Sequence, residues 1–504
     1  MSAASPVPPF HGDPVNAKDR KGIAGIFLED SDIEIFECDK TGNVQQRLLH
    51  TADNGIISVT LPPDDHSGLM LTTKQAHGQK RSNNLIFKSF RGWRQAAFDS
   101  FLPVGFPHSV SDDYLAYQTY DSLQAFFSTI SSLLASRALL QGLGVGDASS
   151  SATLAMLLTI FQDAMSRIAT IFFAYRFGLR IEPDAKRYRF LADVFNDTAF
   201  FLDLYSPYLG SLGKVISLCT GAALRALCGV AGGASKAALS VHFAKHDNLA
   251  ELNAKEASQE TAVGLIGLLV GTVVVKLVED HQSVVFLMTA LVIGHLWVNY
   301  AGVCSVHMTT LNRQRATILF NEYLKTGNVL SPKEVAKKEN ILFWDPVVLN
   351  SRGEKHARIE FAKGYQHARD SRPGNTKVFG LDGPMHTQFI SRRLKDGFKT
   401  IRILLWDGAE PSHVIMAWFL AMEIAGAIRS VGDCSDQLDH VVGQGDANGA
   451  AAEDGPGSID FKKRYCDLKL WEKMEALGWD IGSQAFETGP PVRIRFQPAA
   501  RKDE

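Results

Sequence analysis

The strongest constraint on the fold is a pair of apolar stretches in the middle of the chain. Residues 261–275 and 281–312 contain no Asp, Glu, Lys or Arg. Their apolar parts, residues 262–278 and 284–303, each have about the 17–25 residues that a helix needs to cross a bilayer. A short polar turn over residues 279–282 separates them. The pattern predicts a helical hairpin in a membrane.

Charged and polar residues around this hairpin bear on its environment. Lys255, Arg313 and Arg315 flank its outer ends, while its tip is acidic, so the positive-inside rule places both outer ends in the cytosol. His295 and Asn299 are four residues apart and share one helix face. In a membrane such residues mark a functional interior. In a soluble core they would be ordinary hydrogen-bonded groups, so a buried soluble hairpin stays an alternative.

A second feature is a helix predicted over residues 211–245, which is rich in Gly, Ala and Ser. Lys214, Arg225 and Lys236 recur every 11 residues, about three helical turns, and therefore lie on one narrow stripe. This basic stripe could meet an anionic head group or a phosphate-bearing ligand. Alternatively, the long side chains simply extend to a polar edge of the helix.

Small residues line another side of the same predicted helix. Gly229, Gly233 and Ala237 follow one another at intervals of four residues, a spacing that packs helices tightly. Gly232 and Gly233 also lack a Cβ atom, so they would let a ligand approach the backbone beside Lys236. We expect this small-residue row to face a neighbouring helix.

Motifs for catalysis or metal binding are sparse. His242 and His246 are four residues apart and could hold a metal with Glu251 or Glu256, but no spacing fixes a third ligand, and a hydrogen-bonded helix end is the alternative. The chain has neither a phosphate-loop motif nor Gly-x-Ser-x-Gly. We therefore expect a non-enzymatic protein without a metal site or a tightly bound cofactor. The candidate ligand-binding residues are Lys214, Arg225, Gly232, Gly233, Lys236, His242, His295 and Asn299.

Composition excludes some classes of partner and compartment. A net charge of -2 and a pI near 6.7 argue against a nucleic-acid-binding protein. Six scattered cysteines without Cys-x-x-Cys spacing indicate reduced thiols in an intracellular protein. The N-terminus has neither the apolar core of a secretory signal nor the Arg-rich character of a transit peptide. We expect an intracellular membrane protein.

The patterns predict a mainly α fold with a multi-helix core, a membrane hairpin, a small N-terminal β segment and a C-terminal α+β domain. The predicted parts are a disordered arm over residues 1–20, a short β-containing region over 21–85, a helical core over 86–330, a linker over 331–375, and an α+β domain over 376–504 with a disordered insertion over 432–458.

Several motif blocks follow one another in order across the predicted core. They lie at residues 103–110, 113–118, 142–146, 185–189, 192–193, 196–197, 229–239, 258–261, 299–300 and 310–312. Together they closely resemble the root UVB sensitive (RUS) family. The chain departs from the family over residues 162–170, where a Gly- and Arg-containing pattern is expected and only Asp163 is kept.

The resemblance implies a biological role but not a specific reaction. Plant members of the family are linked to the UV-B response and to vitamin B6 homeostasis, and two of them act as partners. It therefore implies another family member or a second copy of this chain as partner, besides membrane lipid, and pyridoxal phosphate as the ligand to consider. A Lys Schiff base would be the expected chemistry, but nothing singles out Lys236 or Lys255 for it. A small-anion transporter or channel and an enzyme of unrecorded activity are the alternatives.

Overall fold

The protein divides into two compact units, one formed by residues 1–110 and 245–248 and the other by residues 111–244 and 249–504. The computed structural model describes residues 33–38, 44–51, 55–59, 100–142, 152–245, 247–349, 355–368, 376–379, 386–392, 399–431, 468–489 and 492–495. The disordered arm expected over residues 1–20 and the insertion expected over 432–458 lie outside these residues.

A three-stranded antiparallel sheet forms the N-terminal part of the first unit. The strands β1 (Ile33–Cys38), β2 (Val44–Thr51) and β3 (Gly55–Val59) pair in the order β1-β2-β3. In the register, Ile33 lies opposite His50 and Gly55 lies opposite Thr51. The sheet falls within the region over residues 21–85 that the alternating sequence pattern assigned to strands.

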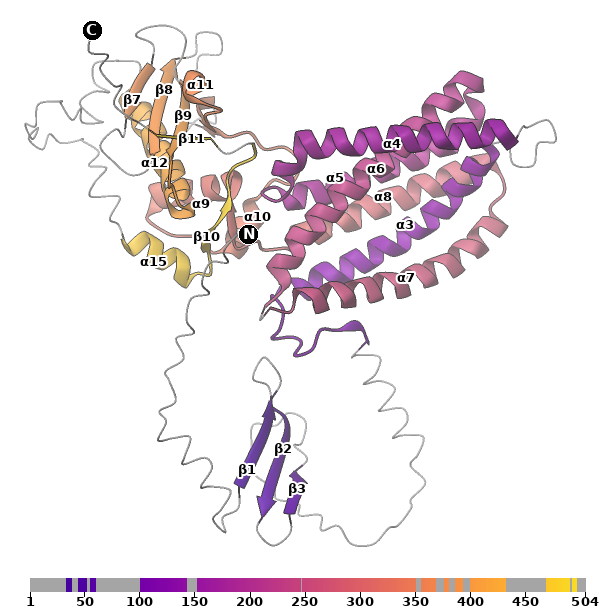
Figure 1. Ribbon diagram of the computed structural model, residues 1–504, viewed down its shortest axis with the longest axis horizontal. Coiled ribbons are helices and arrows are strands. Elements are labelled where there is room, and N and C mark those ends of the chain that lie inside the picture. The colour runs from indigo at the N-terminus through magenta and orange to yellow at the C-terminus, as the bar shows by residue number, and fades with distance from the viewer. Residues whose placement is uncertain are drawn as a thin grey trace, which may run out of the picture. The chain divides into compact units, whose positions relative to one another are not determined.

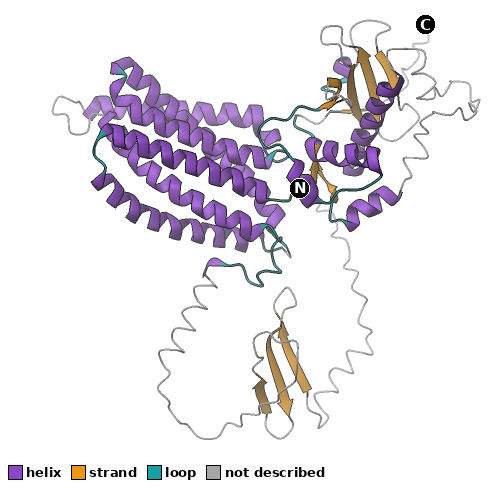
Figure 2. Cartoon of the chain, turned by 180° about the vertical axis from the view of Figure 1, so that it is seen from behind, coloured by secondary structure: helices purple, strands orange, loops and turns teal. Residues whose placement is uncertain are grey.

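Six long helices run side by side in the second unit (Figures 1 and 2). They are α3 (Tyr114–Gly142), α4 (Ala152–Ile181), α5 (Ala185–Tyr205), α6 (Gly210–Phe243), α7 (Leu249–Leu277) and α8 (His281–Ser305). Helix α5 packs against α6, α3 and α8 and touches α4, while α3 also packs against α7 and α8, and α6 against α4. This arrangement places α5 among four of the five other helices of the bundle.

Five of these helices are long and apolar enough to cross a membrane. The candidate spans are Tyr114–Leu140, Thr153–Ile181, Gly210–Phe243, Leu249–Leu277 and His281–Ser305. The last two are the expected hairpin. Its first helix, α7, already begins at Leu249, because polar residues extend the helix before its apolar part. Helix α5 is the exception, since it carries basic and acidic side chains along its length.

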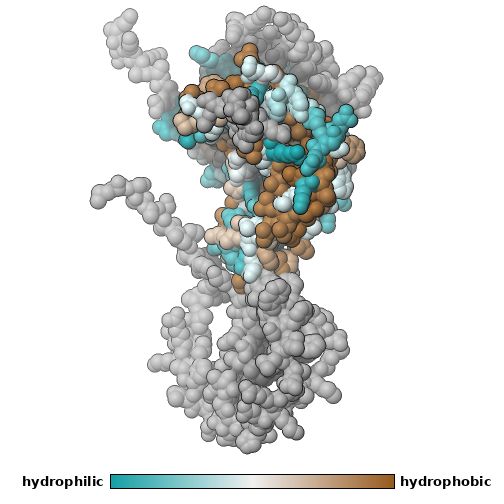
Figure 3. Space-filling model, turned by 90° about the vertical axis from the view of Figure 1, so that its right-hand side faces the viewer, coloured by the Kyte–Doolittle hydropathy of each residue, from teal (hydrophilic) through white to brown (hydrophobic). Residues whose placement is uncertain are grey.

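The outer surfaces of the candidate spans are apolar. Large hydrophobic side chains are exposed on α4, α7 and α8, among them Tyr175, Leu277 and Phe286, which are 87%, 76% and 79% exposed. Figure 3 shows a broad hydrophobic area on the described surface. A surface of this kind marks a contact with lipid or with another protein.

The remainder of the second unit is an α+β region. Its main sheet has the strand order β5-β6-β9-β8-β7, with β11 pairing in parallel with β9, and a separate parallel pair joins β4 to β10. The elements are β4 (Thr310–Asn312), α9 (Arg313–Thr326), α10 (Pro332–Lys338), β5 (Val347–Leu349), β6 (Lys355–Phe361), α11 (Tyr365–Ala368), β7 (Thr376–Phe379), β8 (His386–Arg392), β9 (Lys399–Trp406), α12 (Pro411–Val431), α15 (Leu468–Ala476), β10 (Asp480–Ala485) and β11 (Arg493–Ile494).

The hydrophobic core of this region lies between helices α9 and α12 and the sheet. Phe320 of α9 packs edge-on against Phe419 of α12, with ring centroids 5.0 Å apart, and Ile401 of β9 is fully buried in the same cluster. The linker expected over residues 331–375 contains β5 and β6 of the main sheet. Along β6, charged residues alternate with the buried Ala357 and Ile359. This alternation gives the segment a mixed, polar composition, which is why the sequence suggested a linker.

The small residues that pack helices closely are not the ones that the spacing on α6 suggested. Gly229 and Gly233 are exposed, and a Cβ atom at either position would meet nothing within 4 Å. A Cβ atom at Gly267 would instead lie 2.9 Å from Thr129 Cβ, and one at Gly271 would lie 2.5 Å from Leu133 Cδ1. The close contact is therefore between α7 and α3, and the expected small-residue row faces away from the bundle.

We predict that Gly271→Leu lowers the free energy of unfolding by about 1–3 kcal/mol, because the added side chain overpacks the contact with α3. Gly233→Leu is the matched control, since it adds the same side chain to a helix at an open position. Thermal unfolding of the purified protein in detergent measures both. Equal midpoints for the two variants would contradict the α3–α7 contact.

Candidate functional site: an ionic network inside the helical bundle

A row of charged residues follows one face of α5. Arg189, Asp193 and Asp197 occur at intervals of four residues, so their side chains lie above one another on the helix. All three are buried. Because α5 packs against α3 and α8, this face meets polar side chains of both helices.

Arg189 joins α5 to α3. Its guanidinium group lies 2.7 Å from Asp121 Oδ1 and 3.3 Å from Asp193 Oδ1. Its Nε also donates to the hydroxyl group of Tyr117 at 3.2 Å. A buried guanidinium with several charge-assisted hydrogen bonds fixes the position of the carboxylates around it.

Two polar residues of α8 complete the network. His295 and Asn299 are 1% and 2% exposed and share one face of α8, as their spacing predicts, and this face meets α5. His295 Nδ1 lies 2.8 Å from Asp197 Oδ2, and the Asn299 side-chain amide donates to Asp193 Oδ2. The structure thus gives both predicted residues internal partners.

Gln124 of α3 adds a further contact to the same carboxylate, because its Nε2 donates to Asp193 Oδ2 at 2.5 Å. Asp193 therefore accepts hydrogen bonds from residues of α3, α5 and α8. A single carboxylate that receives bonds from three helices sets their relative position.

Helices α6 and α7 add charges next to Asp121 of α3. Lys236 Nζ lies 2.5 Å from Glu260 Oε1 and 4.0 Å from Asp121 Oδ2. Glu256 is 1% exposed, and within the described part of the chain its carboxylate oxygens have no hydrogen-bond partner. The network thus holds more carboxylates than fixed positive charges. Its carboxylates are Asp121, Asp193, Asp197, Glu256 and Glu260, and its fixed cations are Arg189 and Lys236.

The predicted basic stripe does not form one site. At 1.5 Å per residue, each of Lys214, Arg225 and Lys236 lies about 16.5 Å from the next along the helix, and the first lies about 33 Å from the last. These distances are too long for one small ligand. Arg225 pairs with the buried Asp203, and Lys236 pairs with Glu260. Lys214 is half-buried and makes no ion pair or hydrogen bond with a described residue.

The predicted glycines also lie apart from the network. A Cβ atom at Gly232 would lie 3.6 Å from Ala192 Cβ of α5, an ordinary packing distance. Gly233 is exposed, as described above. Neither glycine lies against a described cavity, so their expected role in a ligand's approach rests on the sequence alone.

His242 belongs to a separate cluster around Asp113, just before α3. His242 Nε2 lies 3.0 Å from Asp113 Oδ2, and the backbone N–H of His307 donates to the same oxygen at 2.5 Å. Burial alone would raise the pKa of the Asp113 carboxyl, but the hydrogen bonds from His242, Ser111 and His307 hold that pKa well below its usual range. This cluster ties α3 to the end of α6 and to the segment after α8.

No group of three or more His, Cys, Asp or Glu side chains that could hold a metal occurs among the residues that the structure describes. His246 lies outside the described residues. His242 is held by a carboxylate that also accepts a backbone N–H, so its position has a structural explanation.

Sequence reasoning did not single out the central members of the network. Arg189, Asp193 and Asp197 appeared only as parts of motif blocks, and Asp121 lies just after the block at 113–118. The available signal was the spacing on α5, where charged residues recur every four positions in a helix that also carries many apolar ones. Nothing in the sequence gave their partners on α3 and α8.

We predict that Arg189→Met lowers the free energy of unfolding by about 3–5 kcal/mol, because it leaves Asp121 and Asp193 buried without their cation. Lys214→Met is the control, since Lys214 has no described partner. Thermal unfolding in detergent, followed by circular dichroism, compares the variants. An unchanged midpoint for Arg189→Met would show that the network does not stabilise the bundle.

Comparison with known proteins places this bundle in a family. Residues 88–327 match the family model described as the vitamin B6 photo-protection and homoeostasis domain. RUS family member 1 of Dictyostelium discoideum is 40% identical over 259 residues, which cover 50% of this chain and 49% of that protein. The chain thus spans about half the length of that relative. No solved structure matches the chain.

Plant relatives extend the match. Protein root UVB sensitive 3 of Arabidopsis thaliana is 34% identical over 343 residues, which cover 67% of this chain and 76% of that protein. Protein root UVB sensitive 5 of the same plant is 30% identical over 256 residues, covering 49% of this chain and 50% of that protein. The motif blocks, the family model and these relatives agree, and the chain belongs to the root UVB sensitive family.

Proposed function

We propose that the protein is a non-enzymatic factor of an intracellular membrane that contributes to vitamin B6 homeostasis and to the UV-B response. The observation that carries the membrane part is the distribution of polarity in the helical bundle. Charged groups lie inside it, while large apolar side chains of α4, α7 and α8 face outward. The description of the matching family model supports the vitamin B6 part.

A bilayer suits this distribution for two reasons. Lipid removes the exposed apolar side chains from water, which is favourable in proportion to their area. Lipid also keeps water away from the interior, where ionisable groups persist only when they pair with one another. Tyr175, Leu277 and Phe286 on the outside and Arg189 with Asp121 on the inside meet these two conditions.

The interior charges favour a binding or interaction role over catalysis. Arg189, Lys236 and His295 each lie against a carboxylate of the same bundle. Groups engaged in this way stabilise the structure of the bundle. We propose that the protein works with another member of its family or with a second copy, in contact with membrane lipid and without nucleic acid.

We predict that the protein stays with membranes washed in alkaline carbonate and leaves them only in detergent. Helices that cross the bilayer are held by their buried apolar length, which carbonate does not affect. Immunoblotting of pellet and supernatant gives the result. Complete release of the full-length protein by carbonate would refute the membrane location.

A second function is favoured by the excess of carboxylates in the network. A carrier that moves a small anion across a membrane can bind protons with it, and buried carboxylates are suited to hold those protons. Asp193 and Asp197 lie on the helix that the candidate spans surround, next to His295. We therefore propose proton-coupled transport of a small anion as the alternative to an interaction role.

We predict for this alternative that proteoliposomes take up pyridoxine 5′-phosphate faster when the outside is acidic. Asp197→Asn should abolish the pH dependence, because the amide keeps the shape of the carboxylate and cannot bind the proton. Lys214→Met should transport like the unaltered protein. Uptake equal to that of protein-free liposomes would refute the transport proposal, and the interaction role would be the one that stands.

A further inference from the structure

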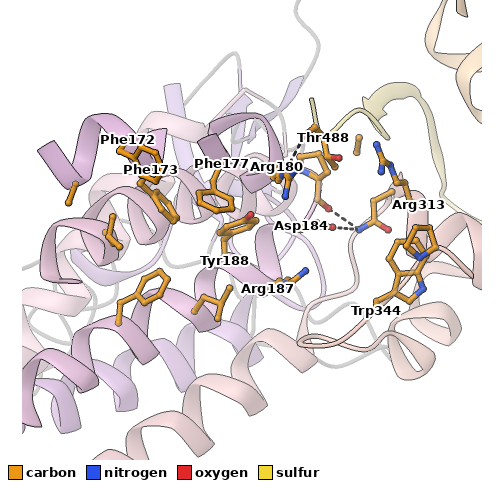
Figure 4. Close-up of a pocket in the computed structure, with 18 residues that line it drawn as sticks. Phe172, Phe173, Phe177, Arg180, Asp184, Arg187, Tyr188, Arg313, Trp344 and Thr488 are labelled. Atoms are coloured by element: carbon orange, nitrogen blue, oxygen red, sulfur yellow. Dashed lines mark hydrogen bonds between the residues drawn. The ribbon is translucent and has the colours of Figure 1, made fainter. Parts of the chain in front are cut away.

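A cavity of about 600 Å³ lies between the ends of the bundle helices and the α+β region (Figure 4). Its walls come from the end of α4, the start of α5, the start of α9 and residues 485–488. Its volume is within the range of about 300–1,000 Å³ that is usual for small-molecule sites. The cavity is separate from the ionic network, whose members do not line it.

Hydrogen bonds close the cavity at the side of the α+β region. Asn312 Nδ2 donates to the carbonyl oxygen of Pro183 at 2.8 Å, and Arg180 Nε donates to that of Thr488 at 3.3 Å. Outside the lining, Lys186 of α5 and Arg315 of α9 also pair with the buried Glu339, at 2.6 and 3.0 Å. These contacts hold the two parts of the wall together.

One side of the cavity is aromatic. Phe173 and Phe177 of α4 lie with ring centroids 5.0 Å apart, and Tyr188 of α5 meets Phe173 edge-on at 6.4 Å. Figure 4 shows Trp344 across the cavity from these rings. Such a wall is suited to a flat ring or to another apolar group of a ligand.

Three arginines line the same cavity, and they differ from the cations of the bundle. Arg180, Arg187 and Arg313 come from three different helices or their ends. Among the described residues, none of the three forms an ion pair. By contrast, Arg189, Arg225 and Lys236 each pair with a carboxylate. Arg180 lies over the Phe177 ring and Arg313 over the Phe361 ring, at 5.7 and 5.4 Å from the ring centroids, but no described carboxylate pairs with either to neutralise its charge. The cavity arginines therefore have charge available for a ligand.

The backbone orients two of these arginines. The Nε atoms of Arg180 and Arg313 donate to the carbonyl oxygens of Thr488 and Phe486, at 3.3 and 2.7 Å. Their terminal amino groups make no hydrogen bond with a described residue. Asp184 is the one carboxylate in the lining, and among the described residues its side chain accepts a single hydrogen bond, from Asn312 at 3.4 Å.

The charge balance of the cavity also favours an anion. Burial lowers the pKa of Arg313, and Arg180 adds to that effect, while the carboxylates of Asp184, Glu360 and Glu487 oppose it. Burial raises the pKa of Asp184, which weakens the one negative charge of the lining. A bound anion would remove the repulsion between the guanidinium groups, and these groups recognise phosphate oxygens in a bidentate way.

We propose that this cavity binds a phosphate monoester, with the phosphate group on Arg180, Arg187 and Arg313 and the rest of the ligand against Phe173 and Phe177. Two sources of such a ligand share this chemistry. One is a small phosphorylated ring compound, and the other is the head group of an anionic lipid, since the candidate span Thr153–Ile181 ends beside the cavity.

The test is titration calorimetry of the purified full-length protein in detergent with pyridoxine 5′-phosphate, pyridoxine and inorganic phosphate. Choosing a vitamin B6 compound rests on the proposed function, but the phosphate chemistry of the cavity does not. Pyridoxine 5′-phosphate has no aldehyde, so it cannot form a Schiff base with lysines. We expect it to bind at least about tenfold more tightly than pyridoxine, because only the phosphate engages the arginines.

Variants locate the site. Arg187 is exposed and unpaired, so Arg187→Gln should leave the fold intact and weaken binding about tenfold. Arg167→Gln is the matched control, because Arg167 is an exposed arginine of α4 outside the lining and removing it should change affinity little. Equal weakening by both variants would mean only general charge attraction and would overturn the proposal.

A second experiment, with lipid, distinguishes a lipid head group from a small phosphorylated compound as the ligand. The protein in nanodiscs with and without phosphatidate is analysed by native mass spectrometry for retained lipid. Retention of phosphatidate that Arg187→Gln reduces, without binding of pyridoxine 5′-phosphate, supports the proposal with a lipid as ligand. The absence of binding to inorganic phosphate, pyridoxine 5′-phosphate and phosphatidate overturns it. Carbonate extraction does not depend on the cavity, so the proposed membrane location is judged separately.

Discussion

The helical bundle depends on the burial of one guanidinium group. Removing Arg189 from water costs several kcal/mol unless carboxylates meet it at short distance. Asp121 of α3 and Asp193 of α5 do so, and Tyr117 adds a hydrogen bond. Because Asp193 also accepts from Asn299 of α8, one charged group fixes the positions of three helices. The polar helix α5 can therefore lie among apolar helices only in this arrangement.

Around this interior the bundle is apolar on the outside. A soluble protein of this size would bury such side chains and expose its charges. Here the long helices α4, α7 and α8 present Tyr175, Leu277 and Phe286, while the charges are inside. Close glycine contacts between α7 and α3 are of the kind that membrane helices use, where small residues let backbones approach. Both features support the proposed membrane location.

Whether a carboxylate lies against a basic side chain distinguishes the residues that stabilise the fold from those that could bind an anionic ligand. Arg225 and Lys236 looked like ligand-binding residues along one stripe, but each meets a carboxylate of the protein. The cavity at the end of α4 has the opposite character, because backbone carbonyls orient Arg180 and Arg313, and none of its three arginines has a carboxylate partner among the described residues. Charge alone did not distinguish these groups, whereas the positions of neighbouring carboxylates did.

The sequence by itself determined what depends on local period and composition. The apolar length of the hairpin, the shared face of His295 and Asn299, the mainly helical fold and the family resemblance all follow from residues close together in the chain. It did not determine which face of α6 meets a neighbour, so Gly229 and Gly233 were taken for packing residues in place of Gly267 and Gly271. Only the tertiary structure decided the ion pairs and the cavity, because their members come from helices far apart in sequence. An ion pair or a cavity wall depends on distances in space of a few ångströms, and the spacing of residues along one helix gives no information about the helix beside it.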